Sequence, residues 1–150
     1  AHNAGDFARA KEIYTRILDA DPQPFVKAIV HIHRGMAQFA EGSYRAALDD
    51  FGAALALDDT NCRAHFYRGT VYRTLGDVER ADAEFGRCLE LDPYRIECLY
   101  QRSAMRLQHG DLDGARADCR AALEIEPDSE MLSRLLSAID ERRAYGGRNE

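Results

Sequence analysis

The chain has 150 residues, of which 45% are hydrophobic and 31% are charged, and its formal net charge at pH 7 is −6. That length and composition suit a globular protein with its own core. The negative charge disfavours a nucleic-acid partner, which would call for a basic face. No apolar run approaches the roughly 18 residues of a membrane-spanning helix, so we expect no membrane insertion.

The cysteines predict a reducing compartment. The chain has four, Cys62, Cys88, Cys98 and Cys119, and none is part of a Cys-x-x-Cys pair. This spacing disfavours a structural zinc site and predicts four free thiols. Free thiols in turn favour a cytoplasmic location. Because residue 1 is Ala rather than Met, we also expect the chain to be a fragment.

Glycines reveal an internal repeat. Gly42, Gly76 and Gly110 recur at a spacing of 34 residues and open the phrases GSYRAAL, GDVERAD and GDLDGAR, while Gly5 opens GDFARA. A period of this length predicts stacked units of secondary structure. Residues that every unit reuses usually serve packing, so the repeat also argues against an active site.

The first copy is incomplete, because only four residues precede Gly5. We predict a partial repeat over 1–24 that keeps its second helix, at about 7–20, and lacks most of its first. Without that first helix, an apolar stripe should be exposed and available for self-association. The stripe consists of Phe7, Ala10, Tyr14 and Ile17.

The next helix is expected to be about one turn longer than its counterparts. The interval from Gly5 to Gly42 is 37 residues, three more than the period. The extra segment is Phe25-Val26-Lys27.

Residues 62–95 illustrate a complete unit. Apolar positions recur at threes and fours over 62–75 and 78–91, which predicts a helix pair broken at Leu75-Gly76-Asp77. Gly76 suits the positive φ that follows a helix end, and Asp77 is expected to cap the second helix. Equivalent caps are expected at Asp6, Ser43 and Asp111.

Small and large residues occupy fixed places in each unit. Seven residues before the turn glycine stands a small residue, which is Gly35, Gly69 or Ser103. Nine residues after that glycine stands a large residue, Phe51 or Phe85, or the exception Cys119. Two helices can pack closely where a small residue on one lies opposite a large residue on the other. We therefore predict that the two helices of the unit cross at close distance at Gly69.

An arginine and an acid also recur together. The arginine directly precedes the small residue, and the acid directly precedes the large one. We predict an ion pair inside each unit, with a structural role. The three pairs are Arg34–Asp50, Arg68–Glu84 and Arg102–Asp118.

This pattern resembles the tetratricopeptide repeat family over residues 1–129, as in Gly69, Gly76-Asp77, Ala81, Phe85, Cys88-Leu89 and Leu91-Asp92-Pro93. The resemblance implies an all-α fold, a right-handed superhelix of antiparallel helix pairs that holds a protein partner in its concave groove. We assign one domain over 1–144, with full repeats at 28–61, 62–95 and 96–129. The chain departs from the family pattern at the front of the first helix, where His31, His65 and Leu99 replace the usual aromatic residue.

The C-terminal segment is interpreted as a capping helix over 130–144, followed by a flexible tail over 145–150. A stack needs such a helix, apolar inside and polar outside, for its solubility. Its apolar stripe is Met131, Leu132, Leu135, Leu136 and Ile139.

The partner-binding groove should be lined by the first helices of the repeats, with an apolar, aromatic-rich strip and a few polar side chains. Some of these residues, Phe39 and Leu107 above all, could equally fill the core. The candidates are Ile32, His33, Met36, Phe39, Arg63, Phe66, Tyr67, Thr70, Arg73, Tyr100, Gln101, Ala104, Leu107 and Gln108.

No cofactor or catalytic site is predicted. His31 and His33 point about 200° apart on a helix and cannot share a metal ion. No glycine elbow or phosphate loop appears. Relatives that clamp acidic C-terminal tails use several basic residues on these helices, and only Arg63 is suitably placed, so tail clamping is not expected. The favoured function is a peptide- or helix-binding scaffold; the alternatives are a self-association module and a regulatory domain of a larger enzyme.

Overall fold

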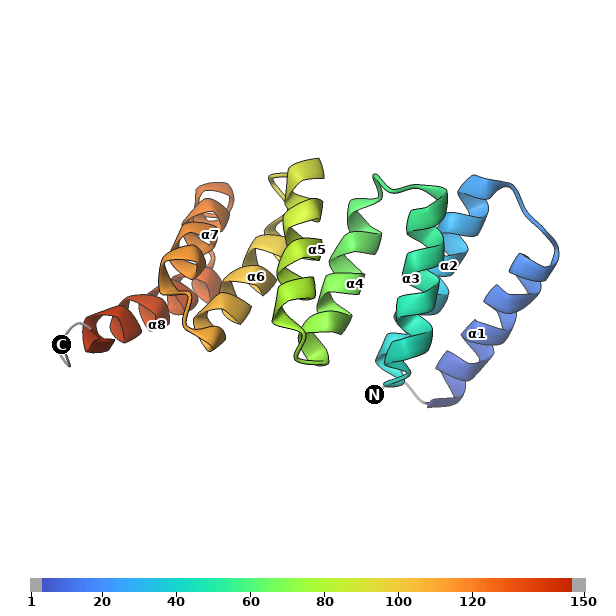
Figure 1. The fold of residues 1–150 in the computed structure, drawn as a ribbon, viewed down its shortest axis with the longest axis horizontal. Coiled ribbons are helices and arrows are strands. Elements are labelled where there is room, and N and C mark those ends of the chain that lie inside the picture. The colour runs from blue at the N-terminus through green and yellow to red at the C-terminus, as the bar shows by residue number, and fades with distance from the viewer. Residues whose placement is uncertain (1–3, 147–150) are drawn as a thin grey trace. The chain divides into compact units, whose positions relative to one another are not determined.

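The computed structural model describes residues 4–146, which form eight helices and no strand (Figure 1). The helices are α1 (Ala4–Asp19), α2 (Pro24–Ala40), α3 (Tyr44–Leu57), α4 (Cys62–Thr74), α5 (Val78–Leu91), α6 (Ile96–His109), α7 (Leu112–Ile125) and α8 (Glu130–Gly146). The two helices expected at 62–75 and 78–91 are confirmed by α4 and α5. Within the described range, none of the helices has the length and apolar character to cross a membrane.

The chain divides into two compact units, unit 1 (Ala1–Glu84) and unit 2 (Phe85–Glu150), with the boundary inside α5. Each unit builds its own core from the repeated apolar positions.

The turns within the helix pairs follow the glycine period. Gly76 has φ +80°, as predicted, and Gly42 and Gly110 have φ +83° and +88°. Two of the expected caps form: an Asp77 oxygen accepts from the Arg80 N–H at 3.1 Å, and an Asp111 oxygen accepts from the Gly114 N–H at 3.0 Å.

The predictions of the other two caps, at Ser43 and Asp6, are wrong. Ser43 precedes α3 but makes no capping hydrogen bond with its side chain. Asp6 lies inside the first turn of α1, because that helix already begins at Ala4.

Unit 1 places a small residue against a large one where α2 packs on α3. A Cβ atom added to Gly35 would lie 2.7 Å from Cε1 of Phe51, which is too close for two carbon atoms. Phe51 is fully buried and stacks on Tyr67 of α4, with ring centroids 5.8 Å apart. The remaining buried members of this core are Ile32, Ala47, Ala54, Leu55, Ala64 and Val71.

Helix α2 carries the expected extra turn. It has 17 residues, whereas α4 has 13 and α6 has 14. The extension lies at its N-terminus, where Pro24 occupies the first turn, a position at which a missing N–H costs nothing.

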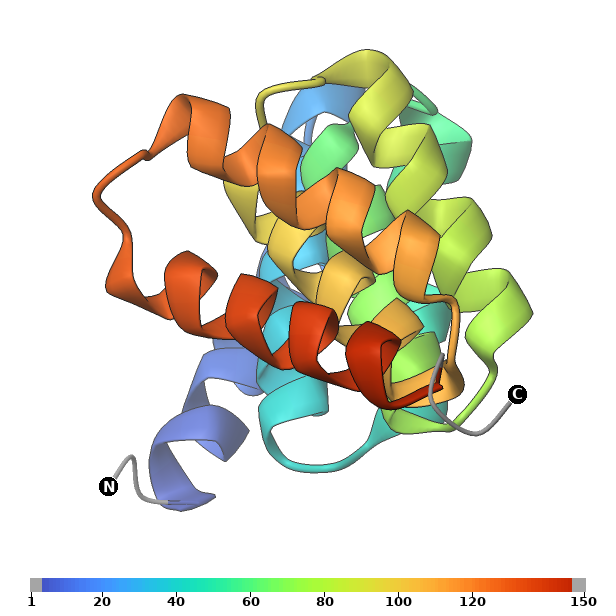
Figure 2. The same cartoon turned by 90° about the vertical axis from the view of Figure 1, so that its left-hand side faces the viewer.

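Unit 2 is built around α6, α7 and α8. In Figure 2, α7 (orange) and α8 (red) lie in front, closest to the viewer. The buried hydroxyl of Ser103 on α6 donates to the carbonyl oxygen of Ala115 on α7 at 2.8 Å. Leu132 and Ile139, one on each side of the middle of α8, are fully buried. The apolar stripe of the capping helix α8 therefore packs on the core of unit 2 through these two residues.

The predicted C-terminal tail begins at Tyr145, but α8 continues through Gly146. Residues 147–150 lie outside the described range.

The expected N-terminal edge is not exposed. Phe7, Ala10, Tyr14 and Ile17 are all half-buried, because α1 packs on α2. The ring of Tyr14 lies against the ring of His33 on α2, with centroids 6.0 Å apart. The prediction of an uncovered apolar stripe is therefore wrong.

The prediction of four free thiols is also wrong. Cys98 and Cys119 are free and buried, whereas Cys62 and Cys88 are disulfide-bonded. Burial raises the pKa of the Cys98 thiol to about 12. The argument from free thiols to a reducing compartment thus loses its basis.

Candidate functional site

The recurring arginines pair with the recurring acids, as predicted. The Arg34 guanidinium donates from Nε to Oδ2 and from Nη2 to Oδ1 of Asp50, both at 2.7 Å. In unit 2, Arg102 makes the same bidentate contact with Asp118: its Nε donates to Oδ2 at 2.8 Å and its Nη2 donates to Oδ1 at 2.7 Å. Both carboxylates are at most 5% exposed as residues, and two parallel charged hydrogen bonds fix their position.

The histidines that depart from the family pattern belong to the same clusters. His31 Nδ1 lies 2.8 Å from Asp50 Oδ1, and His65 Nδ1 lies 2.7 Å from Oε2 of Glu84. Arg68 completes the second cluster, with its Nη2 2.5 Å from Glu84 Oε1. Both histidines therefore have a structural role, because each contacts the carboxylate on the second helix of its own repeat.

The third repeat carries Leu99 in place of histidine and compensates from another position. There Arg106 Nη1 donates to Asp118 Oδ2 at 3.1 Å, in addition to Arg102. The buried carboxylates of Asp50 and Asp118 and the half-buried carboxylate of Glu84 thus each have two cationic or imidazole side chains as partners, which offsets the cost of removing a charge from water.

The first-helix face of unit 1 is defined here by Met36 of α2 and Arg63, Phe66, Tyr67 and Thr70 of α4. The Tyr67 ring meets the Phe66 ring edge-on at 5.2 Å between centroids. The exposed Arg63 lies over Tyr67, with its Cζ 5.7 Å from the ring centroid, and its Nη2 lies 3.8 Å from the Met36 sulfur. Such edge-on and cation–π contacts hold the aromatic side chains in place without burying them fully.

The other candidates of unit 1 are distributed between this face and the core. Ile32 is only 3% exposed and belongs to the core, while Phe39 is half-buried and packs against it. Arg73 is half-buried. The Thr70 hydroxyl donates to the carbonyl oxygen of Phe66 at 2.9 Å, which satisfies it within α4.

His33 is the one groove candidate with a shifted pKa. Burial lowers the pKa of its imidazole, and the nearby Arg63 lowers it further. Its ring is therefore neutral at pH 7 and presents an uncharged surface next to Tyr14.

Unit 2 contains an open cleft of about 470 Å³ between α6 and α8. Its lining residues are Tyr100, Glu130, Met131, Arg134 and Leu135. Met131 is 52% exposed, and Arg134 Nη2 pairs with Glu130 Oε1 at 2.5 Å. The cleft thus combines an apolar lining with a charged rim.

The remaining candidates of unit 2 differ in exposure. Gln101 and Ala104 are half-buried and Gln108 is exposed, whereas Leu107 packs against the core. Of the five predicted positions on α6, Tyr100 is the one that lines the cleft.

The contribution of α8 to this cleft is not among the predictions from the sequence. Those predictions assign Met131 and Leu135 to the apolar stripe of a capping helix, together with Leu132 and Ile139. The spacing offered a signal: Leu132 and Ile139 lie seven residues apart on one side, while Met131 and Leu135 lie four apart on the neighbouring side. A helix with two apolar edges can cover a core with one and line a cleft with the other.

Comparisons with known proteins agree with the fold. The tetratricopeptide repeat family model matches residues 62–95, and no curated protein matches the sequence. Many solved structures are similar, and three of them are tetratricopeptide-repeat proteins with the following likeness.

The second repeat domain of human RPAP3, in complex with the HSP70 peptide SGPTIEEVD, has 26% identity and a TM-score of 0.73, over 79% of this chain and 98% of that one. The first such domain of Spaghetti (RPAP3), bound to the HSP90 peptide SRMEEVD, has 24% identity and a TM-score of 0.75, over 79% and 94%. A tetratricopeptide repeat protein from Parabacteroides merdae has 23% identity and a TM-score of 0.86, over 94% and 55%. Residues 62–95 thus form a tetratricopeptide repeat, and the chain folds as a tetratricopeptide-repeat domain.

Proposed function

We propose that this chain is a scaffold that binds a peptide segment of a partner protein on the first helices of its repeats and on α8, and that it carries out no catalysis of its own. The observation that carries the proposal is the cleft of about 470 Å³ between α6 and α8. Its volume falls in the range of about 300–1,000 Å³ that is usual for binding pockets. Tyrosine and methionine, which line it at Tyr100 and Met131, are enriched at the centres of protein interfaces.

The chemistry of both units favours an apolar ligand. The first-helix face of unit 1 offers Phe66, Tyr67 and Met36, and the unit 2 cleft offers Tyr100 and Leu135. These side chains suit large apolar residues of an extended segment or of an amphipathic helix. The two RPAP3 domains solved with peptides support peptide binding as the general activity.

An acidic C-terminal tail is a poorer fit to this chain. Arg134 at the cleft is already paired with Glu130, and Arg63 is engaged with Tyr67 and Met36. A carboxylate ligand would have to compete with these contacts. We therefore expect SGPTIEEVD and SRMEEVD to bind more weakly than peptides with aromatic or aliphatic anchors.

The test is selection from a random peptide library on the immobilised chain, followed by affinity measurement with the two acidic peptides as comparison probes. Selected peptides should carry apolar anchors, and Tyr100→Ala or Phe66→Ala should weaken them by about tenfold, as expected for an interface hot spot. Tyr94→Ala is the control, because Tyr94 is 77% exposed and lies between α5 and α6. The proposal is wrong if neither variant changes the affinity, or if only the acidic peptides bind and Arg63→Ala abolishes their binding.

A further inference from the structure

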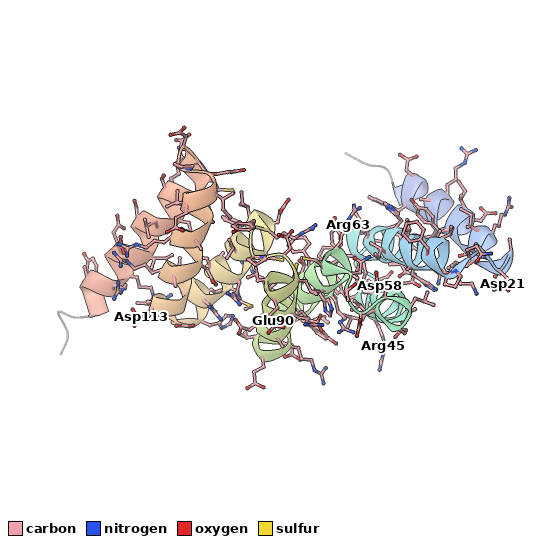
Figure 3. The ribbon with its side chains drawn as sticks, turned by 90° about the horizontal axis from the view of Figure 1, so that it is seen from above. Asp21, Arg45, Asp58, Arg63, Glu90 and Asp113 are labelled. Carbon is pink, nitrogen blue, oxygen red and sulfur yellow. The ribbon has the colours of Figure 1, made fainter. Side chains whose placement is uncertain are left out.

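A second recess lies in unit 1, where α2 begins and α3 ends, and it shares no residue with the first-helix face. It is a cavity of about 220 Å³. Its lining residues are Pro24, Phe25, Ala28 and Ile29 of α2, Leu57 of α3, and Asp58 and Asn61 of the loop before α4. Figure 3 looks down on this end of the helices and labels Asp58.

Three large apolar side chains around this recess are exposed. Phe25 is 76% exposed, Leu57 is 44% exposed and Ile29 is 37% exposed. Phe25 belongs to the extra turn that makes α2 longer than α4 and α6. Single exposed apolar residues are ordinary, but several large ones around one cavity mark an interaction site.

The size of the recess limits what it can accept. About 220 Å³ lies below the range of roughly 300–1,000 Å³ in which drug-sized ligands are buried. The recess suits one anchoring side chain, with Phe25 and Leu57 flanking it as the surrounding apolar contacts. This arrangement is that of a hot-spot pocket in a protein interface.

The rim of the recess is acidic. Asp58 Oδ1 accepts hydrogen bonds from the hydroxyl and the N–H of Thr60, at 2.6 and 3.1 Å, and these bonds lower the pKa of the Asp58 carboxyl. Asp59 beside it is exposed. Two cations of the neighbouring segments have other contacts, since Lys27 pairs with Asp21 and Arg63 lies over Tyr67.

We propose that this recess binds a second partner segment, one that inserts a large aliphatic side chain flanked by Lys or Arg. The aliphatic side chain would occupy the cavity between Ile29 and Leu57. The flanking cations would meet Asp58 and Asp59, and complementary charge at a rim gives specificity and faster association. The surface is separate from the first-helix face, so both could be occupied together.

Two model peptides test this proposal directly: a short amphipathic helix of leucine and lysine, and the same peptide with glutamate in place of lysine. Both are titrated into the isotope-labelled chain and followed by NMR. The lysine peptide should shift the amides of residues 25–29 and 57–61, and the glutamate peptide should not. Raising the salt concentration should weaken the binding, because exposed charges are screened.

The affinity of the lysine peptide for three variants shows whether it binds at this recess or elsewhere on the surface. Phe25→Ser should weaken the lysine peptide by about tenfold, and Asp58→Asn by a smaller factor. Leu75→Ser is the control, since Leu75 is 52% exposed at the end of α4 and should leave the affinity unchanged. Circular dichroism checks that each variant is folded.

Three results would overturn the proposal. The first is equal binding of the glutamate peptide, and the second is a set of shifts confined to Phe66 and Tyr67. The third is a dimer in sedimentation that Phe25→Ser abolishes, because the occupant would then be a second copy of the chain. Tyr100→Ala leaves the recess intact, so failure here and failure of the proposed function are distinguishable.

Discussion

The close approach of α2 and α3 at Gly35 yields a prediction whose sign depends on two opposing terms. Gly35→Ala improves helix propensity by about 0.8–1.0 kcal/mol. The added Cβ would meet three atoms of the Phe51 ring at 2.7–3.0 Å. That ring is fully buried and stacked on Tyr67, so it has little room to move. Overpacking of this kind costs about 1–3 kcal/mol, and we expect a net loss of about 0–2 kcal/mol.

Gly52→Ala supplies the matched control. Gly52 directly follows Phe51 within α3, and a Cβ added there would meet nothing within 4 Å. The same change should therefore stabilise the protein by the propensity term alone, about 0.8–1.0 kcal/mol. The two alanine variants should differ by about 1–3 kcal/mol, which for a chain of this length is a difference of several degrees in Tm.

Urea denaturation followed by circular dichroism measures both variants. Midpoints are compared rather than extrapolated free energies, because repeat proteins need not unfold in a single step. A further variant, Gly35→Ala with Phe51→Leu, should recover part of the loss, since the smaller side chain makes room for the new methyl group. If Gly35→Ala raises the midpoint as much as Gly52→Ala does, the close crossing is not where the structure places it.

Three further predictions concern single side chains. The pKa of His33, followed by NMR, should lie below 6.5 because burial favours its neutral form; the stability this provides is present above pH 6.5 and is lost as the pH falls toward the lowered pKa. Arg102→Met should cost about 1.5–3 kcal/mol in urea denaturation because it removes two charged hydrogen bonds from buried Asp118, whereas exposed Arg120→Met should change little. Thiol titration of the unfolded, unreduced chain should count two thiols, and in the folded chain Cys98 should not react at neutral pH because its pKa is about 12.

The repeated features of the fold could be predicted from the sequence. The glycine period places Gly76 at a positive φ, and the co-occurrence of Arg34 with Asp50 identifies a real ion pair. These features are predictable because each one appears several times, so that a packing requirement stands out against chance. Ser43 shows the limit of this reasoning: it occupies a capping position in register with Asp77, but its side chain makes no capping hydrogen bond.

Long-range geometry could not be predicted in the same way. The spacing of Cys62 and Cys88 holds no information on sulfur distances, and the free-thiol prediction failed there. The predicted exposure of the N-terminal stripe is wrong because α2, which follows α1, packs against Tyr14 through the ring of His33. Neither outcome can be inferred from a local sequence pattern.

The positions that break the repeat are the ones that shape the surface. Where the units agree, as at Phe51 or Asp118, the side chains are buried and serve to hold one helix against the next. The extra turn of α2 has no place in the period, and it brings Phe25 to the rim of a cavity. Helix α8 likewise lacks the signature of a full repeat, and it supplies Met131 to a cleft. A stacked fold obtains its stability from what its units share, so its choice of partner must come from what they do not share. Substitutions at Phe25 and Met131 should therefore change binding far more than stability, and substitutions at Phe51 should do the reverse.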